Sequence, residues 1–215
     1  MLEGLEISVL NLSELLIENK IFRIDSEFQL KEYINTLNKV KDISNFTLES
    51  QLELLTDGKH GGVTQTEKGV IFLRTTNIKE NEIDLSDKRF ISIEESEETL
   101  RAEFKEDDLL LTTIGTIGLC AKVPKLFLRA TINQNLVRIV LKNKSLSSFI
   151  CCFLNLKYGK NQLLRFGAGN VYQMINYPNL KKILIPSFSS LNKSIDDVYL
   201  NSENKKNQAK QSYTK

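Results

Sequence analysis

Five short segments of this chain carry amide, hydroxyl and cationic side chains, three of them beside glycines. They are DGKHGG at 57–62, RTTN at 74–77, TTIGTIG at 112–118, TINQN at 131–135 and RFGAGNVYQ at 165–173. Cations and backbone N–H groups can hold phosphates, and Arg, Lys, Asn, Gln, Ser and Thr side chains can read base edges. Each segment alone is typical of an ordinary turn, whereas the series suits a surface that contacts a nucleic acid.

Known catalytic patterns fit these residues poorly. The stretch TTIGTIGLCAK lacks the spacing and the Lys–hydroxyl pair of a phosphate-binding GxxxxGK[ST] loop. The chain has one histidine, His60, and no CxxC or GxSxG motif, which argues against a structural zinc site and against a serine triad. The segment NYPN at 176–179 resembles the [ND]PP[YF] motif of amino-methyltransferases only superficially. The sequence therefore favours binding over catalysis, with no cofactor and no metal.

The charges are distributed unevenly along the chain, although the net charge is only +2. Residues 1–108 hold 24 Asp or Glu against 13 Lys or Arg, whereas residues 109–195 hold 12 Lys or Arg and no carboxylate. This asymmetry predicts a basic surface that faces a polyanion, with an acidic back. The alternative is that the two stretches interleave in space and neutralise each other.

The elements that must position these segments are short. We expect helices at 25–40, with Asp25 or Ser26 as cap, at 93–104 and at 145–166, the last interrupted at Gly159. Strands are expected at 70–75, 107–114, 119–124, 135–142 and 179–186. The alternation in NLVRIVLK at 135–142 predicts one buried face. The tail from Ser187 to Lys215 contains no Gly or Pro and reads as a helix that needs a partner.

The compartment is predicted from three features of the sequence. Cys120, Cys151 and Cys152 are odd in number and two are adjacent, which favours buried thiols in a reducing cytoplasm over a disulfide framework. No apolar run approaches the roughly 20 residues that span a bilayer. The start MLEGLEISVL lacks the basic and apolar regions of a secretory signal.

The order of these motifs resembles the target recognition domain of type I restriction–modification specificity subunits, which also occurs in some fused restriction–methylation enzymes. The motifs stand here as DGKHGG, FLRTTNIKENEIDL, RFISIEE, DDLLLTTIGTIGLCAKVP, NQNLVRI, FLNLKYGKNQLLRFGAGNVYQ and LKKILIPSF. They cover about residues 54–190. Asp107 stands where the family usually has Gly, and Asn192 stands where its helix normally begins with Gln.

The resemblance implies an α+β fold, in which one target recognition domain of short mixed and antiparallel strands with flanking helices precedes a long C-terminal spacer helix. It implies a lead-in over 1–50, a recognition domain over 51–186 and the spacer helix over 187–215. Contacts to DNA are expected from Lys59, His60, Arg74, Thr75, Thr76, Asn77, Asn170 and Gln173, and phosphate contacts from Lys157, Lys160 and Arg165. A tight structural turn is expected at Gly115, Thr116 and Gly118.

The resemblance also implies partners and leaves alternatives open. Modification subunits would methylate adenine and restriction subunits would cleave, while this chain would read double-stranded DNA and catalyse nothing alone. Two copies could pair through the C-terminal helix. The alternatives are a recognition segment of a single-chain restriction–methylation enzyme and a protein–protein adaptor. His60 could also be only a hydrogen-bonded turn residue, and Lys157 and Lys160 could lie on a merely solvated helix face.

Overall fold

The computed structural model describes residues 9, 11–13, 23, 25–125, 129–167, 173–187 and 192–212. Its helices are α2 (Lys31–Lys41), α3 (Leu48–Gln51), α4 (Ile93–Glu97), α5 (Ser147–Asn155), α6 (Lys157–Phe166), α7 (Tyr177–Lys181) and α8 (Asn192–Ser212). Its strands up to residue 91 are β1 (Ser44–Thr47), β2 (Leu52–Asp57), β3 (Gln65–Thr66), β4 (Val70–Leu73), β5 (Ile78–Lys79), β6 (Glu82–Ile83) and β7 (Arg89–Ile91). The later strands are β8 (Leu109–Thr112), β9 (Cys120–Lys122), β10 (Ala130–Ile132), β11 (Leu136–Leu141) and β12 (Leu184–Pro186).

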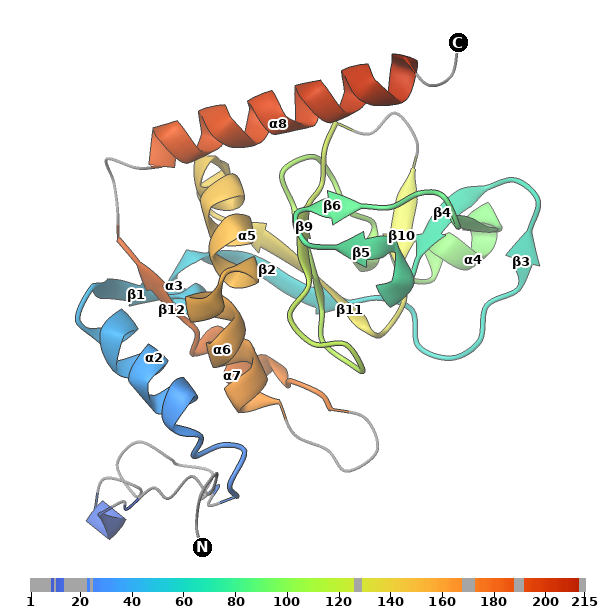
Figure 1. The fold of residues 1–215 in the computed structure, drawn as a ribbon. Coiled ribbons are helices and arrows are strands. Elements are labelled where there is room, and N and C mark those ends of the chain that lie inside the picture. Colours follow the sequence, from blue (N-terminus) through green and yellow to red (C-terminus); the bar gives the residue numbers. More distant parts are fainter. Residues whose placement is uncertain are drawn as a thin grey trace, which may run out of the picture.

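Two four-stranded sheets form the centre of the fold, with strand orders β2-β11-β8-β9 and β10-β4-β7-β3 (Figure 1). The first sheet is antiparallel, whereas β4 and β10 in the second are parallel, with Ile132 opposite Leu73. Small pairs β1-β12 and β5-β6 complete the strands. This mixture of short strands and flanking helices confirms the α+β class that the sequence predicts.

The sheet β2-β11-β8-β9 is covered on both faces. One face packs Val137, Ile139 and Leu141 against α5 and α6 in the larger apolar cluster, and the other packs Leu110 and Leu136 against β4 and β10. All six residues of β11 are buried. The expectation of one buried face for this strand was therefore wrong, because the second sheet covers the face that carries Arg138.

The helices begin and end differently from the sequence-based expectation. The first helix begins at Lys31 rather than near residue 25, because residues 26–29 form turns in which Asp25 accepts a hydrogen bond from the Phe28 N–H at 3.0 Å. The break between α5 and α6 lies at Leu156, and Gly159 lies inside α6. The expected strand at 179–186 is helix α7 followed by β12, because the Asn176 side chain caps α7 by accepting from the Asn179 N–H.

Helix α8 lies across the top of the molecule in Figure 1 and is fixed near its first turns. Tyr199 is buried, and its hydroxyl donates to the Asn81 carbonyl at 3.1 Å between β5 and β6. The Lys122 Nζ lies 5.0 Å from the centre of the Tyr199 ring. Val198 and Leu200 on α8 are exposed, so this helix leaves apolar side chains uncovered.

The cysteines and the helix lengths bear on the predicted compartment. Cys120 and Cys151 are buried free thiols, and burial raises the pKa of the half-buried Cys152 to about 11. Cys120 and Cys151 belong to the larger apolar cluster, as the sequence predicts for buried thiols. Within the described ranges, no helix combines the length and the apolar character needed to cross a membrane.

Candidate nucleic-acid interface

Four segments that the sequence singled out lie next to one another in the fold, namely 57–62, 74–77, 112–118 and 131–135. Of the fifth, 165–173, only its last residue, Gln173, adjoins them among the described residues. We call this surface the loop edge and define it as residues 58–62, 74–77, 113–118, 131–135 and 173–175. Backbone hydrogen bonds join four of these segments in series, and 131–135 also bonds to Leu73, directly before 74–77, so the edge is part of the scaffold rather than a set of independent loops.

The first two neighbours are the segments 58–62 and 131–135. The Lys59 N–H donates to the Ile132 carbonyl and the Gln134 N–H donates to the Lys59 carbonyl, both at 3.1 Å. The Gln134 side chain accepts from the Gly61 N–H at 2.9 Å. A Cβ at Gly58 would lie 1.8 Å from the Ile132 carbonyl oxygen, so only glycine permits this close approach.

Segment 74–77 joins the edge because β4 and β10 are parallel and end together. The Asn133 N–H donates to the Leu73 carbonyl at 3.0 Å. Asn77 is 1% exposed, accepts from the Arg74 N–H at 2.9 Å and donates to the Asp84 carbonyl at 3.0 Å. This burial corrects the expectation that Asn77 reads a base, because its amide holds the turn together instead. Thr76 beside it is exposed, and Thr75 is half-buried.

The turn 113–118 connects the remaining segments. The Thr113 N–H donates to the Asn135 carbonyl at 3.0 Å, and the Gly115 N–H donates to the Gln173 carbonyl at 2.9 Å. Gly115 and Gly118 have φ of 80° and 91°, in the left-handed region that favours glycine. These values agree with the structural turn that the sequence predicts there. Thr116 and Gln173 are exposed, whereas the expected contact Asn170 lies outside the described residues.

The cations of the loop edge are paired with carboxylates. The Lys59 Nζ lies 2.7 Å from Glu98 and 3.0 Å from Glu95, and hydrogen bonding to Glu98 raises the pKa of Lys59. Arg74 lies 2.6 Å from Asp87.

His60 is exposed and is paired in the same way, since its Nε2 lies 2.6 Å from the Asp57 carboxylate. Burial raises the pKa of Asp57, but the hydrogen bonds from His60 and Arg101 outweigh it and leave the pKa below its usual value.

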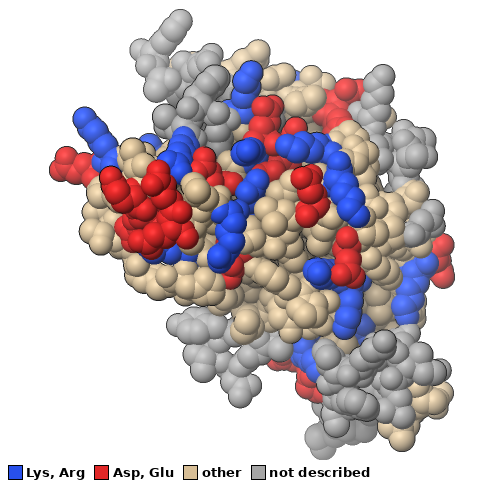
Figure 2. All heavy atoms as spheres, turned by 180° about the vertical axis from the view of Figure 1, so that it is seen from behind, with Lys and Arg blue, Asp and Glu red and all other residues tan. Residues whose placement is uncertain are grey.

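The prediction of one basic surface was wrong. Residues from the carboxylate-free stretch pair with carboxylates from the acidic stretch, which folds across from it. The pairs are Lys122–Asp107, Arg129–Glu103, Arg138–Asp108, Lys157–Glu32, Lys160–Glu80 and Lys181–Glu49. Figure 2 shows basic and acidic side chains interspersed over one face, with an acidic group over the side that carries α4. Sequence position therefore does not predict where charge gathers on this surface.

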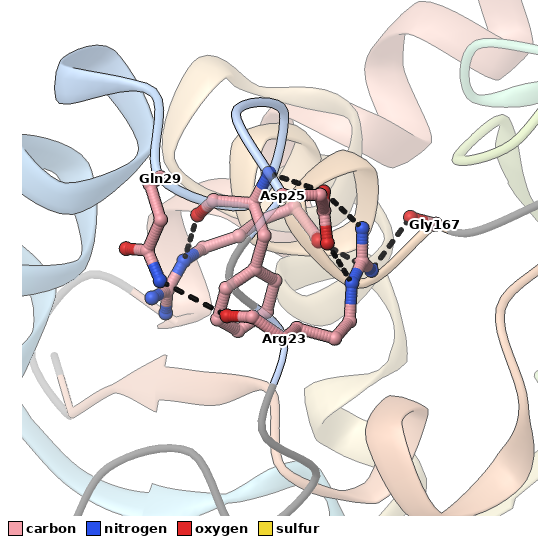
Figure 3. A network of polar contacts seen from close by, with 6 residues as sticks. Arg23, Asp25, Gln29 and Gly167 are labelled. Carbon is pink, nitrogen blue, oxygen red and sulfur yellow. Dashed lines mark hydrogen bonds and ion pairs between the residues drawn. The ribbon is translucent and has the colours of Figure 1, made fainter. Parts of the chain in front are cut away.

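Arg165, an expected phosphate contact, is part of the interior. It is 8% exposed, its Nε donates to the Phe28 carbonyl at 3.0 Å, and its guanidinium lies 4.0 Å from the centre of the Phe28 ring. Arg23 binds the same region, donating to Asp25 and, at 2.8 Å, to the Gly167 carbonyl, while Gln29 reaches the Arg23 carbonyl (Figure 3). These contacts fasten the lead-in to the end of α6.

The structure adds residues that the sequence did not single out. Arg89 is the first residue of β7 and pairs with Phe72 near the end of β4, and Lys88 directly precedes it. Neither side chain has a carboxylate partner among the described residues, and Lys88 is exposed. No local signal could have identified them, because their place at the edge depends on the pairing of β4 with β7.

Comparisons with known proteins agree with this architecture. Residues 39–187 match the family described as the type I restriction modification DNA specificity domain. The type I restriction–modification S subunit from M. genitalium is 16% identical over 78% of this chain and 41% of that chain, with a TM-score of 0.52. The type IIG restriction endonuclease BpuSI is 10% identical over 82% of this chain and 28% of that chain, with a TM-score of 0.58.

A third structure, from work on the assembly and conformational transition of a type I restriction–modification system, is 14% identical over 94% of this chain and 53% of that chain, with a TM-score of 0.53. At these identities the likeness concerns the fold, and this chain spans less than two thirds of each of the three chains. A search of curated proteins finds no significant sequence match. Since the family match covers well over half of the sequence, the chain belongs to the type I restriction–modification DNA specificity domain family.

Proposed function

We propose that this chain reads a specific sequence in double-stranded DNA through the loop edge, as a specificity subunit or half-subunit of a type I restriction–modification complex. The observation that carries this proposal is the meeting of five segments, drawn from residues 58–175, at one edge of two packed sheets. Loops positioned by a rigid scaffold are a common way to present binding side chains. Family membership supports DNA as the ligand.

The side chains at the edge divide into two proposed roles. His60, Thr76, Thr116 and Gln173 are exposed and carry groups that can hydrogen-bond to base edges. Phosphate contacts are assigned to Lys59, Arg74, Lys88 and Arg89, with Thr75 beside them. Lys157 and Lys160 remain weaker candidates, because both lie on α6, outside the five segments of the loop edge, and are paired with Glu32 and Glu80.

We assign the methylation and cleavage reactions to other chains of the complex. In this proposal modification subunits methylate adenine and restriction subunits cleave, while this chain positions them and holds no cofactor, in the cytoplasm where the DNA lies. Helix α8 would be the spacer and would pair with a second helix, including that of another copy, through Val198 and Leu200. Two copies would then read a two-fold symmetric, bipartite target.

A second candidate is a recognition segment within a single-chain restriction–methylation enzyme. The similarity of fold to the type IIG restriction endonuclease BpuSI, at a TM-score of 0.58, supports this second candidate. The length of the complete gene separates the two proposals, because a single-chain enzyme would carry a methyltransferase motif on the same polypeptide.

Methylation profiling of the host genome tests the proposed function. With the gene present, we expect adenine methylation at one sequence motif, and deletion of the gene should remove it. A Gln173→Ala variant should shift the motif or lower its occupancy. A methylation pattern that is the same with and without the gene would contradict the proposal.

Measuring the binding of duplex DNA in vitro distinguishes a DNA-reading subunit from a protein–protein adaptor. Binding to duplex DNA should weaken as salt rises if the edge contacts phosphates. An adaptor would show no binding to duplex DNA at low salt.

A further inference from the structure

The cations of the loop edge lie beneath carboxylates rather than facing solvent. The Lys59 side chain is 12% exposed, whereas Glu98, which contacts it at 2.7 Å, is 66% exposed. The Arg74 side chain is 20% exposed, whereas its partner Asp87 is 72% exposed. In both pairs the negative group is the outer one, so an approaching phosphate meets a carboxylate before it meets a cation.

The outer position of the carboxylates matters because a carboxylate repels an approaching phosphate at the distances of a DNA contact. The salt screening length is about 8 Å at physiological ionic strength, so charges in contact are only partly screened. Ion pairs with an exposed partner contribute little to stability, so a phosphate can replace the carboxylate. The two carboxylates come from different parts of the chain, since Glu98 directly follows α4 and Asp87 lies two residues before β7. Their common arrangement is therefore not a property of one local motif.

We propose that Glu98 and Asp87 mask Lys59 and Arg74, so that DNA contacts these two cations only by exchanging the carboxylates for its own phosphates. The inference rests on the proposed function and deepens it. Masking lowers the affinity for every duplex by a similar factor. Non-specific DNA, which offers phosphates alone, then binds poorly, while the target sequence keeps its base contacts.

Masking has a signature in the salt dependence of binding. A cation that neutralises a phosphate releases a counterion from the DNA, which makes binding weaken as salt rises. A carboxylate displaced at the same moment recovers cations from solution and cancels part of that release. The wild-type protein therefore shows a shallower salt dependence than its number of phosphate contacts predicts.

The test uses the full chain with Glu98→Gln, Asp87→Asn and both substitutions together. Affinity for a random-sequence duplex is measured by fluorescence anisotropy over a range of salt concentrations. Each single substitution should tighten binding by about threefold to fivefold. The slope of log affinity against log salt should steepen by roughly 0.9 when Asp87→Asn frees Arg74. It should steepen by less with Glu98→Gln, because Glu95 still lies 3.0 Å from the Lys59 Nζ. Glu49→Gln is the matched control, since it frees Lys181 of α7, to which no DNA contact is assigned, and should change neither quantity.

The outcomes separate masking from the proposed function. Unchanged affinity and slope in both edge variants would overturn the masking. Weaker binding in a variant would also overturn it, because the carboxylate would then contact the DNA itself. Selection of one sequence from a random pool by the wild-type protein tests the proposed function independently. Tighter binding by the edge variants without any sequence selection would retain the masking and refute sequence reading.

Discussion

Two ion pairs in this molecule use the same chemistry in opposite surroundings. In the interior, Arg138 on β11 lies 2.7 Å from Asp108, with side chains 11% and 1% exposed. At the loop edge, Lys59 lies 2.7 Å from Glu98, whose side chain is 66% exposed. The distances are equal, but the first pair is enclosed between two sheets and the second is open to a ligand.

The comparison shows that burial decides what an ion pair does here. Asp108 also accepts from the Lys105 N–H at 2.8 Å, and Arg138 donates to the Arg101 carbonyl at 3.0 Å, so both partners of the buried pair make a further hydrogen bond. Removing one partner would leave an uncompensated charge in a low-dielectric interior. The exposed pair can exchange its carboxylate for another anion, which suits a binding surface.

The largest effect is expected from breaking the buried pair. Arg138→Met should lower the free energy of unfolding by about 3–5 kcal/mol, because Asp108 would remain buried without its cation. Urea denaturation followed by circular dichroism measures it. Adding Asp108→Asn should recover part of the loss. A loss below about 1 kcal/mol in the single variant would show that this pair is as exchangeable as those at the edge.

A smaller effect is expected at Gly58, where the backbone of segment 58–62 lies in close contact with the backbone of segment 131–135. Gly58→Ala should cost about 1–3 kcal/mol, because the new Cβ must push the Ile132 carbonyl away. Gly62→Ala is the matched control, since nothing lies within 4 Å of its Cβ position. Thermal unfolding of the two variants compares them. Equal stability would mean that the edge is looser than its hydrogen bonds indicate.

Substitution of an exposed polar residue of the loop edge should change DNA sequence preference, whereas substitution of a buried one should change stability. Gln173→Ala should change the preference among duplex sequences by on the order of 1 kcal/mol, with unfolding nearly unchanged, because its side chain is exposed and can hydrogen-bond to a base. Asn77→Ala should instead lower stability, because its amide holds the turn. Selection from a random duplex pool and urea denaturation provide the two readouts. The reverse assignment would refute this division.

The smallest effect concerns the Arg23–Asp25 pair. The hydrogen bond from Arg23 holds the pKa of Asp25 below its usual 3.8, although burial opposes it. A lowered folded-state pKa gives stability that is complete above the unfolded pKa and is lost as pH falls through the folded one. The difference in Tm between wild type and Asp25→Asn should thus stay constant above about pH 5 and shrink below 3.8. A difference that grew on acidification would contradict this sign.

The sequence predicted the local elements better than the contacts between them. Strands rich in Val, Ile and Leu, such as β4 and β8, lie where the apolar runs indicate. Four of the five segments of the loop edge were among the candidate loops, and of the fifth only Gln173 was. Asp107 has a φ of 70°, which explains why the family usually has Gly there. In this chain an Asp adopts the left-handed region that Asp tolerates better than most residues.

What the sequence could not give was the pairing of distant charges and the burial of individual polar groups. Arg165 reads as an exposed helix cation, yet it stacks on Phe28 because the lead-in folds back onto α6. Asn77 reads as a loop amide, yet the turn encloses it. Both outcomes depend on tertiary contacts between segments far apart in the chain.

Hydrogen–deuterium exchange with and without a duplex selected from a random pool tests most directly whether the loop edge is the DNA-reading surface. The account predicts protection of the backbone amides in 58–62, 74–77 and 113–118, with exchange on α2 and the outer side of α8 unchanged. Protection confined to α2 and α6, or none anywhere while DNA remains bound, would contradict it.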